Sequence, residues 1–121
     1  MRINLFKPGT HTDSSGTAHT FSEADVRQIA ASYDPAKHQA PYVVGHPQTD
    51  APAYGWVNRL QYAEGILSVA DDEKVDPSFT QLVNDGRFNK ISVRLWHPTD
   101  PGNPTPGQWY LRHIGFLGAA A

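Results

Sequence analysis

The sequence predicts an α+β domain in which short, mainly antiparallel strands outnumber two helices. Several short segments alternate apolar and polar residues with a period of two, as half-buried strands do. Two other segments repeat apolar residues every three or four positions, which is typical of amphipathic helices. Ten prolines and ten glycines are spread through the 121 residues and divide the chain into short elements.

Length, charge and cysteine content restrict the kind of protein. A chain of 121 residues has the size of one domain, so we expect residues 1–121 to form a single domain with one core. The net charge of −2, without a basic run, gives no reason to expect nucleic acid or an anionic membrane as a partner. The absence of cysteine excludes disulfides, thiolate metal sites and a cysteine nucleophile. No segment resembles a secretory signal or a membrane span, so we expect a soluble, cytoplasmic protein.

The N-terminal part is predicted to hold one strand and one long loop. Residues 2–7 alternate and end at Pro8-Gly9, which favours a turn. Residues 10–20 are polar and rich in Ser, Thr and Gly, so we expect a loop in which His11 and His19 are exposed.

Two helices are predicted from their caps and their apolar stripes. Ser22 can cap a first helix that Asp34-Pro35 stops. Asp76 can cap a second helix with Pro77 at its first position and Gly86 beyond its end. The stripes consist of Val26, Ile29, Ala30 and Tyr33 in the first helix, and of Phe79, Leu82 and Val83 in the second.

The other segments are predicted to be strands joined by turns. The expected strands are residues 40–45, 53–60, 66–70, 88–96 and 108–117. A hairpin is predicted across Ala63-Glu64-Gly65, because glycine suits a tight turn. The acidic residues 71–73 are interpreted as a solvated turn, and residues 97–107, with four prolines and two glycines, as a loop beside an exposed His97.

Three residues on different predicted strands could form a catalytic group. Ser92 lies within the alternating segment Ile91–Leu95, where Ile91, Val93 and Leu95 face one side and Ser92 faces the other with Arg94. Ser92 is the one serine without an evident cap, loop or hairpin position. His46 follows a short apolar strand and lies between Gly45 and Pro47, and His113 lies among leucines of the last strand.

These residue types suit acyl transfer. A serine hydroxyl is a weak nucleophile at neutral pH and needs an adjacent base that a third group orients. We expect His46 to take the proton from Ser92 and return it to the leaving amine. His113 would accept a hydrogen bond from the other ring nitrogen of His46. His97 or an acidic residue could take the third position instead, and Arg94 is a candidate to assist at the oxyanion through its side chain.

Four short motifs carry a resemblance to a known family. They are Val43–Pro47, Ala51–Val57, Lys90–Val93 and Leu111–Leu117. Together they resemble the phage head-maturation (prohead) proteases, close to the Mu-like phage I protein group of proteases and scaffolds. These families resemble herpesvirus assemblin, a serine protease with a Ser-His-His triad. By motif match, Ser92 takes the place of the nucleophile, His46 of the base and His113 of the third residue.

The resemblance implies a fold, substrates and a setting. It implies a mainly antiparallel β-barrel flanked by two or more helices. It also implies a serine endopeptidase that processes phage scaffold and major capsid proteins, and itself, inside the assembling procapsid in the host cytoplasm. A dimer on assembly, no cofactor and no metal are expected. Members usually continue into a scaffold segment that this chain lacks, so the Ala-rich end, residues 118–121, could be a self-cleavage boundary or a truncation.

Two other functions remain open from the sequence. The domain could be a non-catalytic capsid-assembly or scaffold module in which Ser92 is a buried strand serine. It could also be a metal-dependent hydrolase that uses His46, Asp50 and another histidine, although the chain has no complete ligand pattern of the usual spacing.

Overall fold

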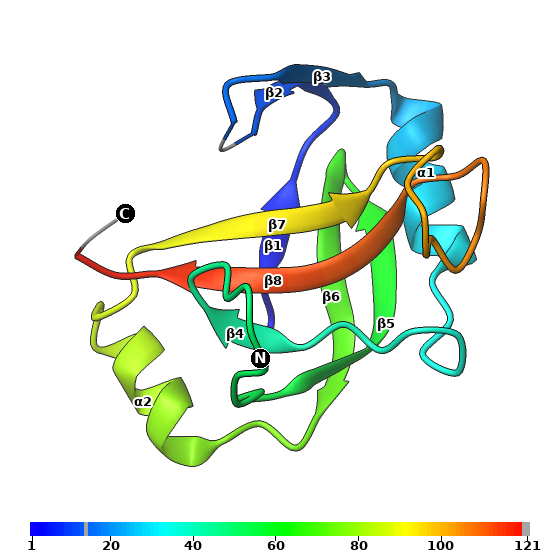
Figure 1. The fold of residues 1–121 in the computed structure, drawn as a ribbon. Coiled ribbons are helices and arrows are strands. Elements are labelled where there is room, and N and C mark those ends of the chain that lie inside the picture. Colours follow the sequence, from blue (N-terminus) through cyan, green and yellow to red (C-terminus); the bar gives the residue numbers. More distant parts are fainter. Residues whose placement is uncertain (14, 120–121) are drawn as a thin grey trace.

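The computed structural model describes residues 1–13 and 15–119, and shows an α+β fold (Figure 1). Ser14 of the predicted loop and Ala120–Ala121 of the Ala-rich end lie outside the described residues. Eight strands and two helices are found in the described part of the chain. In order they are β1 (Asn4–Phe6), β2 (Gly9–Thr12), β3 (Ala18–Phe21), α1 (Glu23–Ser32), β4 (Tyr42–Val44), β5 (Trp56–Ala63), β6 (Ile66–Glu73), α2 (Pro77–Asn84), β7 (Lys90–Trp96) and β8 (Tyr110–Leu117).

The first sheet has the strand order β1-β6-β5, and all its pairings are antiparallel. Its hairpin connects β5 to β6 through Glu64 and Gly65, whose φ angles are 53° and 77°. Two successive positive φ angles define the type I′ turn that matches the twist of paired strands. The predicted hairpin is therefore confirmed. The acidic residues 71–73 lie within β6, so the turn predicted there is wrong.

The second sheet has the order β4-β8-β7 and carries all three predicted catalytic residues on or beside its strands. β8 is the central strand, as Figure 1 shows. It pairs antiparallel with β7 and parallel with the three-residue β4. β4 and β7 are close in space only because both pair with the C-terminal strand.

The third sheet is the hairpin β2–β3, where the sequence predicted a loop over residues 10–20. Thr10 pairs with Thr20 across the hairpin, and their hydroxyls are 2.9 Å apart. At the tip, one carboxylate oxygen of Asp13 accepts hydrogen bonds from the backbone N–H groups of Ser15 and Thr17. Asp13 therefore closes the turn, and the polar composition that suggested a loop is that of an exposed hairpin.

Both predicted helices are confirmed together with their caps. Ser22 and Asp25 form a capping box, in which each side chain accepts a hydrogen bond from the backbone N–H of the other. Asp76 caps α2 through the N–H groups of Ser78 and Phe79, with Pro77 at the first helical position. Neither helix is long and apolar enough to cross a membrane.

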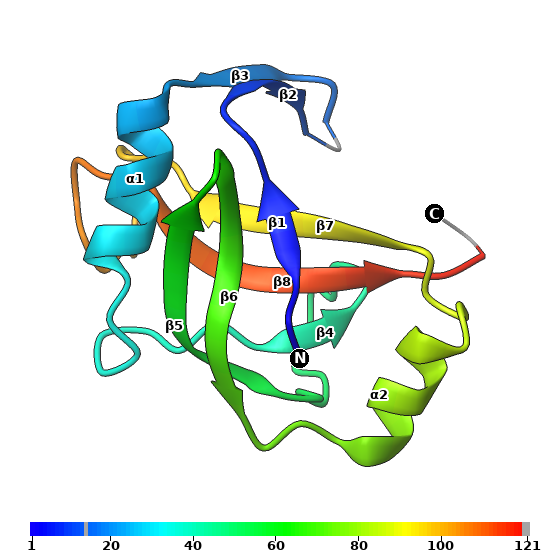
Figure 2. The same ribbon diagram turned by 180° about the vertical axis from the view of Figure 1, so that it is seen from behind.

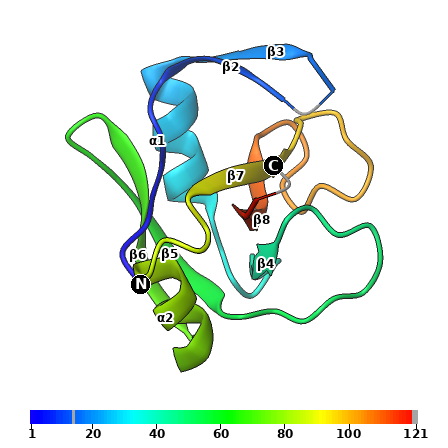
Figure 3. The ribbon, with the colours of Figure 1, turned by 90° about the vertical axis from the view of Figure 1, so that its left-hand side faces the viewer.

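The core lies between the first and second sheets. Figure 2 shows the first sheet in front of the second, and Figure 3 shows the two sheets from the side. Helix α1 contributes Val26 and Ile29 to the core, and α2 contributes Phe79. The sheets contribute the buried side chains of Tyr42, Val57, Leu60, Leu67, Val69, Leu111, Ile114 and Phe116.

The predicted β-barrel is wrong. Four of the five strand pairings in the described residues are antiparallel, as expected, but they form three small sheets and none of them closes. Closure would require the two three-stranded sheets to pair at their edges. In the described part of this fold they are joined at one edge only by an isolated bridge between Pro41 and Trp56, and they otherwise face each other across apolar side chains. Alternation of residues predicts which face of a strand is buried, but it does not specify its neighbour.

Candidate active site

His46 lies two residues beyond β4 and is turned across the second sheet by Gly45. Gly45 has a φ of 68°, in the left-handed region that glycine adopts without steric cost. Its N–H donates a hydrogen bond of 2.9 Å to the carbonyl of Phe116 on β8. The end of β4 is thereby fastened to β8, and the next residue, His46, is held close to the central strand.

Gly115 on β8 provides the space for this close approach. A Cβ atom at Gly115 would overlap the carbonyl oxygen of Gly45 and lie 3.2 Å from Cε1 of His46. A side chain at Gly115 would therefore displace both the turn and the imidazole. Gly115 is not among the residues predicted from the sequence to form the site. A signal was present, because a glycine inside an otherwise apolar strand often marks a close backbone approach.

His46 and His113 form a hydrogen-bonded pair. Nδ1 of His46 lies 2.6 Å from Nε2 of His113, and the ring centroids are 4.9 Å apart. Both side chains are half-buried. The two residues are 67 positions apart in the sequence, and the parallel pairing of β4 with β8 brings them together.

Ser92 lies on the same face of the sheet as this pair. It is directly opposite Gly115 in the β7–β8 register, and opposite residues point to the same face. The Cβ of Ser92 is therefore about 5 Å from the position that a Cβ on Gly115 would occupy. That position on Gly115 is the one that lies 3.2 Å from Cε1 of His46. The Nε2 atom of His46 adjoins Cε1 and is the ring nitrogen that His113 does not engage.

A serine triad also needs a hydrogen bond between the serine hydroxyl and the base, and this bond is not formed among the described residues. Among the described residues, no hydrogen bond joins the Ser92 hydroxyl to His46. Such bonds are often long in enzymes without substrate and shorten when substrate binds. The structure thus brings together all three predicted residues, with one of the two expected hydrogen bonds in place.

Arg94 lies on the same face, opposite His113 in the register. Burial lowers the pKa of His46, and the charge of Arg94 lowers it further. Burial likewise lowers the pKa of His113 to about 4, with further contributions from His46 and Arg94. Both imidazoles are therefore neutral at pH 7, as a general base and its hydrogen-bond acceptor must be. Arg94 is exposed and close enough to act on both histidines.

His19 and His97 make no contact with the pair and pack against Trp109 instead. His97 packs edge-on against Trp109 with ring centroids 4.8 Å apart, and its Nδ1 is 2.8 Å from the hydroxyl of Thr99. Both histidines are half-buried, so their predicted exposure is wrong. The packing of His97 gives no support to it as the third residue, whereas His113 contacts His46 directly.

The residues proposed for a metal site do not gather. Asp50 is exposed in the loop after His46. Within residues 1–13 and 15–119, no group of three or more His, Asp or Glu side chains lies close enough to hold a metal ion. The hypothesis of a metal-dependent hydrolase gains no support from this arrangement.

Comparisons with protein-family models, with curated proteins and with solved structures each found no match to this chain. A function for this chain is therefore inferred from the geometry of Ser92, His46 and His113, together with the resemblance of the short motifs.

Proposed function

We propose that the protein is a serine endopeptidase with Ser92 as nucleophile, His46 as general base and His113 as the residue that orients the base. The observation that carries this proposal is the 2.6 Å hydrogen bond between His46 and His113, located beside Gly115, the register partner of Ser92. Ser92 and His113 lie on the same face of the second sheet, and His46, two residues beyond β4, contacts His113.

The proposed reaction follows from the available atoms. The Ser92 hydroxyl oxygen attacks the carbonyl carbon of a peptide bond, and its proton passes to Nε2 of His46. The protonated His46 then gives this proton to the leaving amine, so the C–N bond breaks and an acyl-serine ester remains. Water, deprotonated by His46, hydrolyses the ester and restores the serine. Throughout, Nδ1–H of His46 donates to Nε2 of His113, which fixes the tautomer that accepts at Nε2.

In the same reaction, the positive charge of Arg94 can stabilise the developing oxyanion. Its side chain starts two residues from Ser92 on the face where the oxyanion would develop. A guanidinium there stabilises negative charge, and it also favours the neutral state of both histidines. We assign Arg94 to oxyanion stabilisation through its side chain.

The substrates follow from the resemblance to prohead proteases. We propose that the enzyme cleaves phage scaffold and major capsid proteins, and its own chain, inside the assembling procapsid in the host cytoplasm, as a dimer. The test is incubation with purified scaffold and capsid proteins of the same phage, followed by mass spectrometry of the new termini. The Ser92→Ala variant is the control.

The nucleophile is tested by a fluorophosphonate, which forms a covalent adduct only with an activated serine. We expect one adduct, confined to Ser92 in a peptide map and missing from Ser92→Ala. Absence of an adduct from folded protein, also at high concentration and in kosmotropic salt, would contradict the proposal.

One observation favours the alternative of a non-catalytic capsid-assembly module, namely the missing hydrogen bond between Ser92 and His46. In that case Ser92 and the histidines would serve packing alone. The fluorophosphonate experiment separates the two functions, because a packing serine has no activating base.

A further inference from the structure

The two larger sheets carry opposite charge. Strands β4, β7 and β8 of the second sheet contain three cationic residues, Lys90, Arg94 and Arg112, and no acidic residue. Strands β1, β5 and β6 of the first sheet contain one arginine and three acidic residues. The net charge of −2 for the whole chain conceals this difference. The candidate active site thus lies on a positively charged sheet, which favours substrates that carry negative charge.

Two of the three cations flank Ser92 on its own face of the sheet. Lys90, Ser92 and Arg94 are alternate residues in the regular part of the β7–β8 register, so their side chains lie on one face. The intervening Ile91 and Val93 pack against the core on the other face. Two residues of a strand span about 6.6 Å, so the side chains of Lys90 and Arg94 each begin about this far from that of Ser92.

Lys90 is the cation of this pair that has no part in the proposed reaction. Its side chain is exposed, and the ion pairs found within residues 1–13 and 15–119 do not include it. Lys90 also belongs, with Arg2, to the residues that line a hollow of about 410 Å³, and none of those residues is acidic. The ammonium group of Lys90 is therefore available to an anion outside the chain.

Building on the proposed function, we infer that Lys90 binds an acidic side chain of the substrate, two or three residues from the cleaved bond. A polypeptide that lies extended along β7, with its scissile carbonyl at Ser92, repeats its side chains on one face at the same spacing as β7. A Glu or Asp side chain at this distance reaches the long, flexible side chain of Lys90. Charge complementarity of this kind selects between partners, so Lys90 is a specificity-determining residue.

The test compares peptides with an uncharged ester, in the full chain. A library of natural-sequence peptides, with both new termini identified by mass spectrometry, locates the acidic position relative to the cleaved bond. A matched pair of peptides then carries Glu or Gln at that position. The ester, 4-nitrophenyl acetate, has no group that reaches Lys90, so its turnover reports the activity of Ser92 alone.

The variants change only the charge of Lys90. Lys90→Gln removes the charge and Lys90→Glu reverses it. The matched control is Lys37→Glu, since Lys37 is also exposed but lies in the turn after α1, outside the second sheet.

We expect wild-type kcat/KM to be up to roughly fivefold higher for the Glu peptide than for the Gln peptide, as an exposed ion pair allows. In Lys90→Gln this ratio should approach one, and in Lys90→Glu the Glu peptide should become the poorer substrate. Both variants should keep wild-type turnover of the ester, and Lys37→Glu should keep the wild-type ratio. Added salt should lower the wild-type ratio, because it screens exposed charges.

Two results would overturn the inference while leaving the proposed function intact. One is cleavage by wild type without a preference for Asp or Glu within three residues of the cleaved bond. The other is a ratio of Glu to Gln peptide cleavage that Lys90→Glu leaves at the wild-type value. If instead Ser92 takes up no fluorophosphonate and the ester is not hydrolysed, the proposed function fails and the inference fails with it.

Discussion

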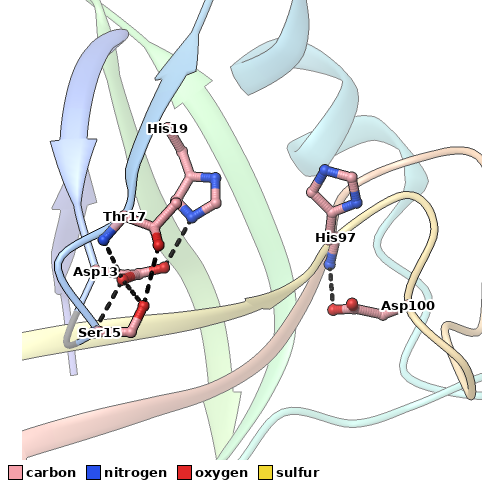
Figure 4. Close-up of polar contacts among 6 residues, drawn as sticks. All are labelled: Asp13, Ser15, Thr17, His19, His97 and Asp100. Atoms are coloured by element: carbon pink, nitrogen blue, oxygen red, sulfur yellow. Dashed lines mark hydrogen bonds and ion pairs between the residues drawn. The ribbon is translucent and has the colours of Figure 1, made fainter.

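Two groups of polar side chains differ in how their hydrogen bonds are connected. The hairpin cluster (Asp13, Ser15, Thr17 and His19) contains the residue types of a serine-histidine-aspartate triad (Figure 4). The histidine pair (His46 and His113) contains no carboxylate. In the hairpin cluster, however, the Ser15 hydroxyl donates to Asp13 at 2.6 Å, and His19 also contacts Asp13, at 2.8 Å. Serine and histidine thus share an acceptor, and neither activates the other.

The two groups also differ in their origin within the chain. The hairpin cluster comes from one turn of seven residues, and its hydrogen bonds lower the pKa of Asp13, first through Ser15 and then through His19. The histidine pair comes from two strands that meet only in the folded sheet, and burial is the main cause of its lowered pKa values. A local turn motif explains the first group. The second has no such local explanation, which favours a chemical role.

The largest expected effect separates the two serines. Ser92→Ala should reduce peptide-bond cleavage by at least about 10³-fold, because the nucleophile is removed. Ser15→Ala should keep wild-type activity, since the Ser15 hydroxyl is bound to Asp13. Steady-state cleavage of a peptide substrate measures both, and circular dichroism verifies the fold. Cleavage retained by Ser92→Ala would contradict the assignment of Ser92 as the nucleophile.

The histidines of the two groups should also differ in how much their replacement lowers kcat. His46→Ala should cost about 10⁴-fold in kcat, and His113→Ala a smaller factor of roughly 10²-fold, because an orienting group contributes less than the base itself. His19→Ala, the control from the hairpin cluster, should change kcat little. Equal losses at His46 and His113, or no loss at His113, would require another third residue.

A third experiment tests the close approach of Gly45 to Gly115, which positions His46. Gly115→Ala should lower both kcat and stability, because its Cβ would overlap the carbonyl oxygen of Gly45. Overpacking of this kind costs about 1–3 kcal/mol of unfolding free energy. Gly118→Ala is the control, since a Cβ there would make an ordinary contact of 3.7 Å with Phe88. Urea denaturation and peptide cleavage report the two effects, and equal behaviour of the variants would contradict the geometry.

The pH dependence of activity should reflect the neutral histidines. Because the pKa of His46 is lowered, kcat/KM should persist below pH 6.5 before it falls on the acid side. In Arg94→Gln, loss of the nearby positive charge should raise the pKa of His46 and move this fall to higher pH. A kcat/KM profile from pH 4 to 8 provides the test. An unchanged acid limb would show that Arg94 does not act on the base.

The smallest effect is expected from the carboxylate of the hairpin cluster. Asp13→Asn should leave activity unchanged and lower the thermal midpoint slightly at pH 7. The folded-state pKa of Asp13 lies below the usual 3.8, so its stabilisation is present at neutral pH and is lost as the pH falls below that value. The difference in midpoint between wild type and variant should therefore shrink in acid, as calorimetry at pH 7 and pH 3 would show.

Local features of the fold could be predicted from the sequence, whereas strand pairing could not. Ser22 and Asp76 are read correctly as caps because a cap involves neighbours three residues apart. The parallel pairing of Tyr42 with Ile114 joins residues 72 positions apart, and nothing in either segment specifies the partner. For the same reason the expected barrel was wrong, since closure depends on which edges meet.

In the candidate site, too, local features could be predicted and contacts that depend on strand pairing could not. His46 and His113 could be proposed because each lies at a position where packing gives an imidazole no evident purpose. Gly115 had a sequence signal as a glycine inside a strand, but its contact with the Gly45 carbonyl depends on β4 pairing with β8, which neither segment specifies. The hairpin β2–β3 was missed because its polar residues satisfy one another across the turn instead of packing in the core.

The parallel pairing of β4 with β8 also determines when a newly made chain acquires its histidine pair. During synthesis, His46 emerges well before β8, and residues 40–42 can already bond to residues 54–57, whereas His113 is supplied only by β8. The imidazole at position 46 therefore lacks its His113 partner until the last strand has been made and has closed the longest loop of the sheet. If the proposed function holds, the histidine pair is assembled only when β8 has paired with β4.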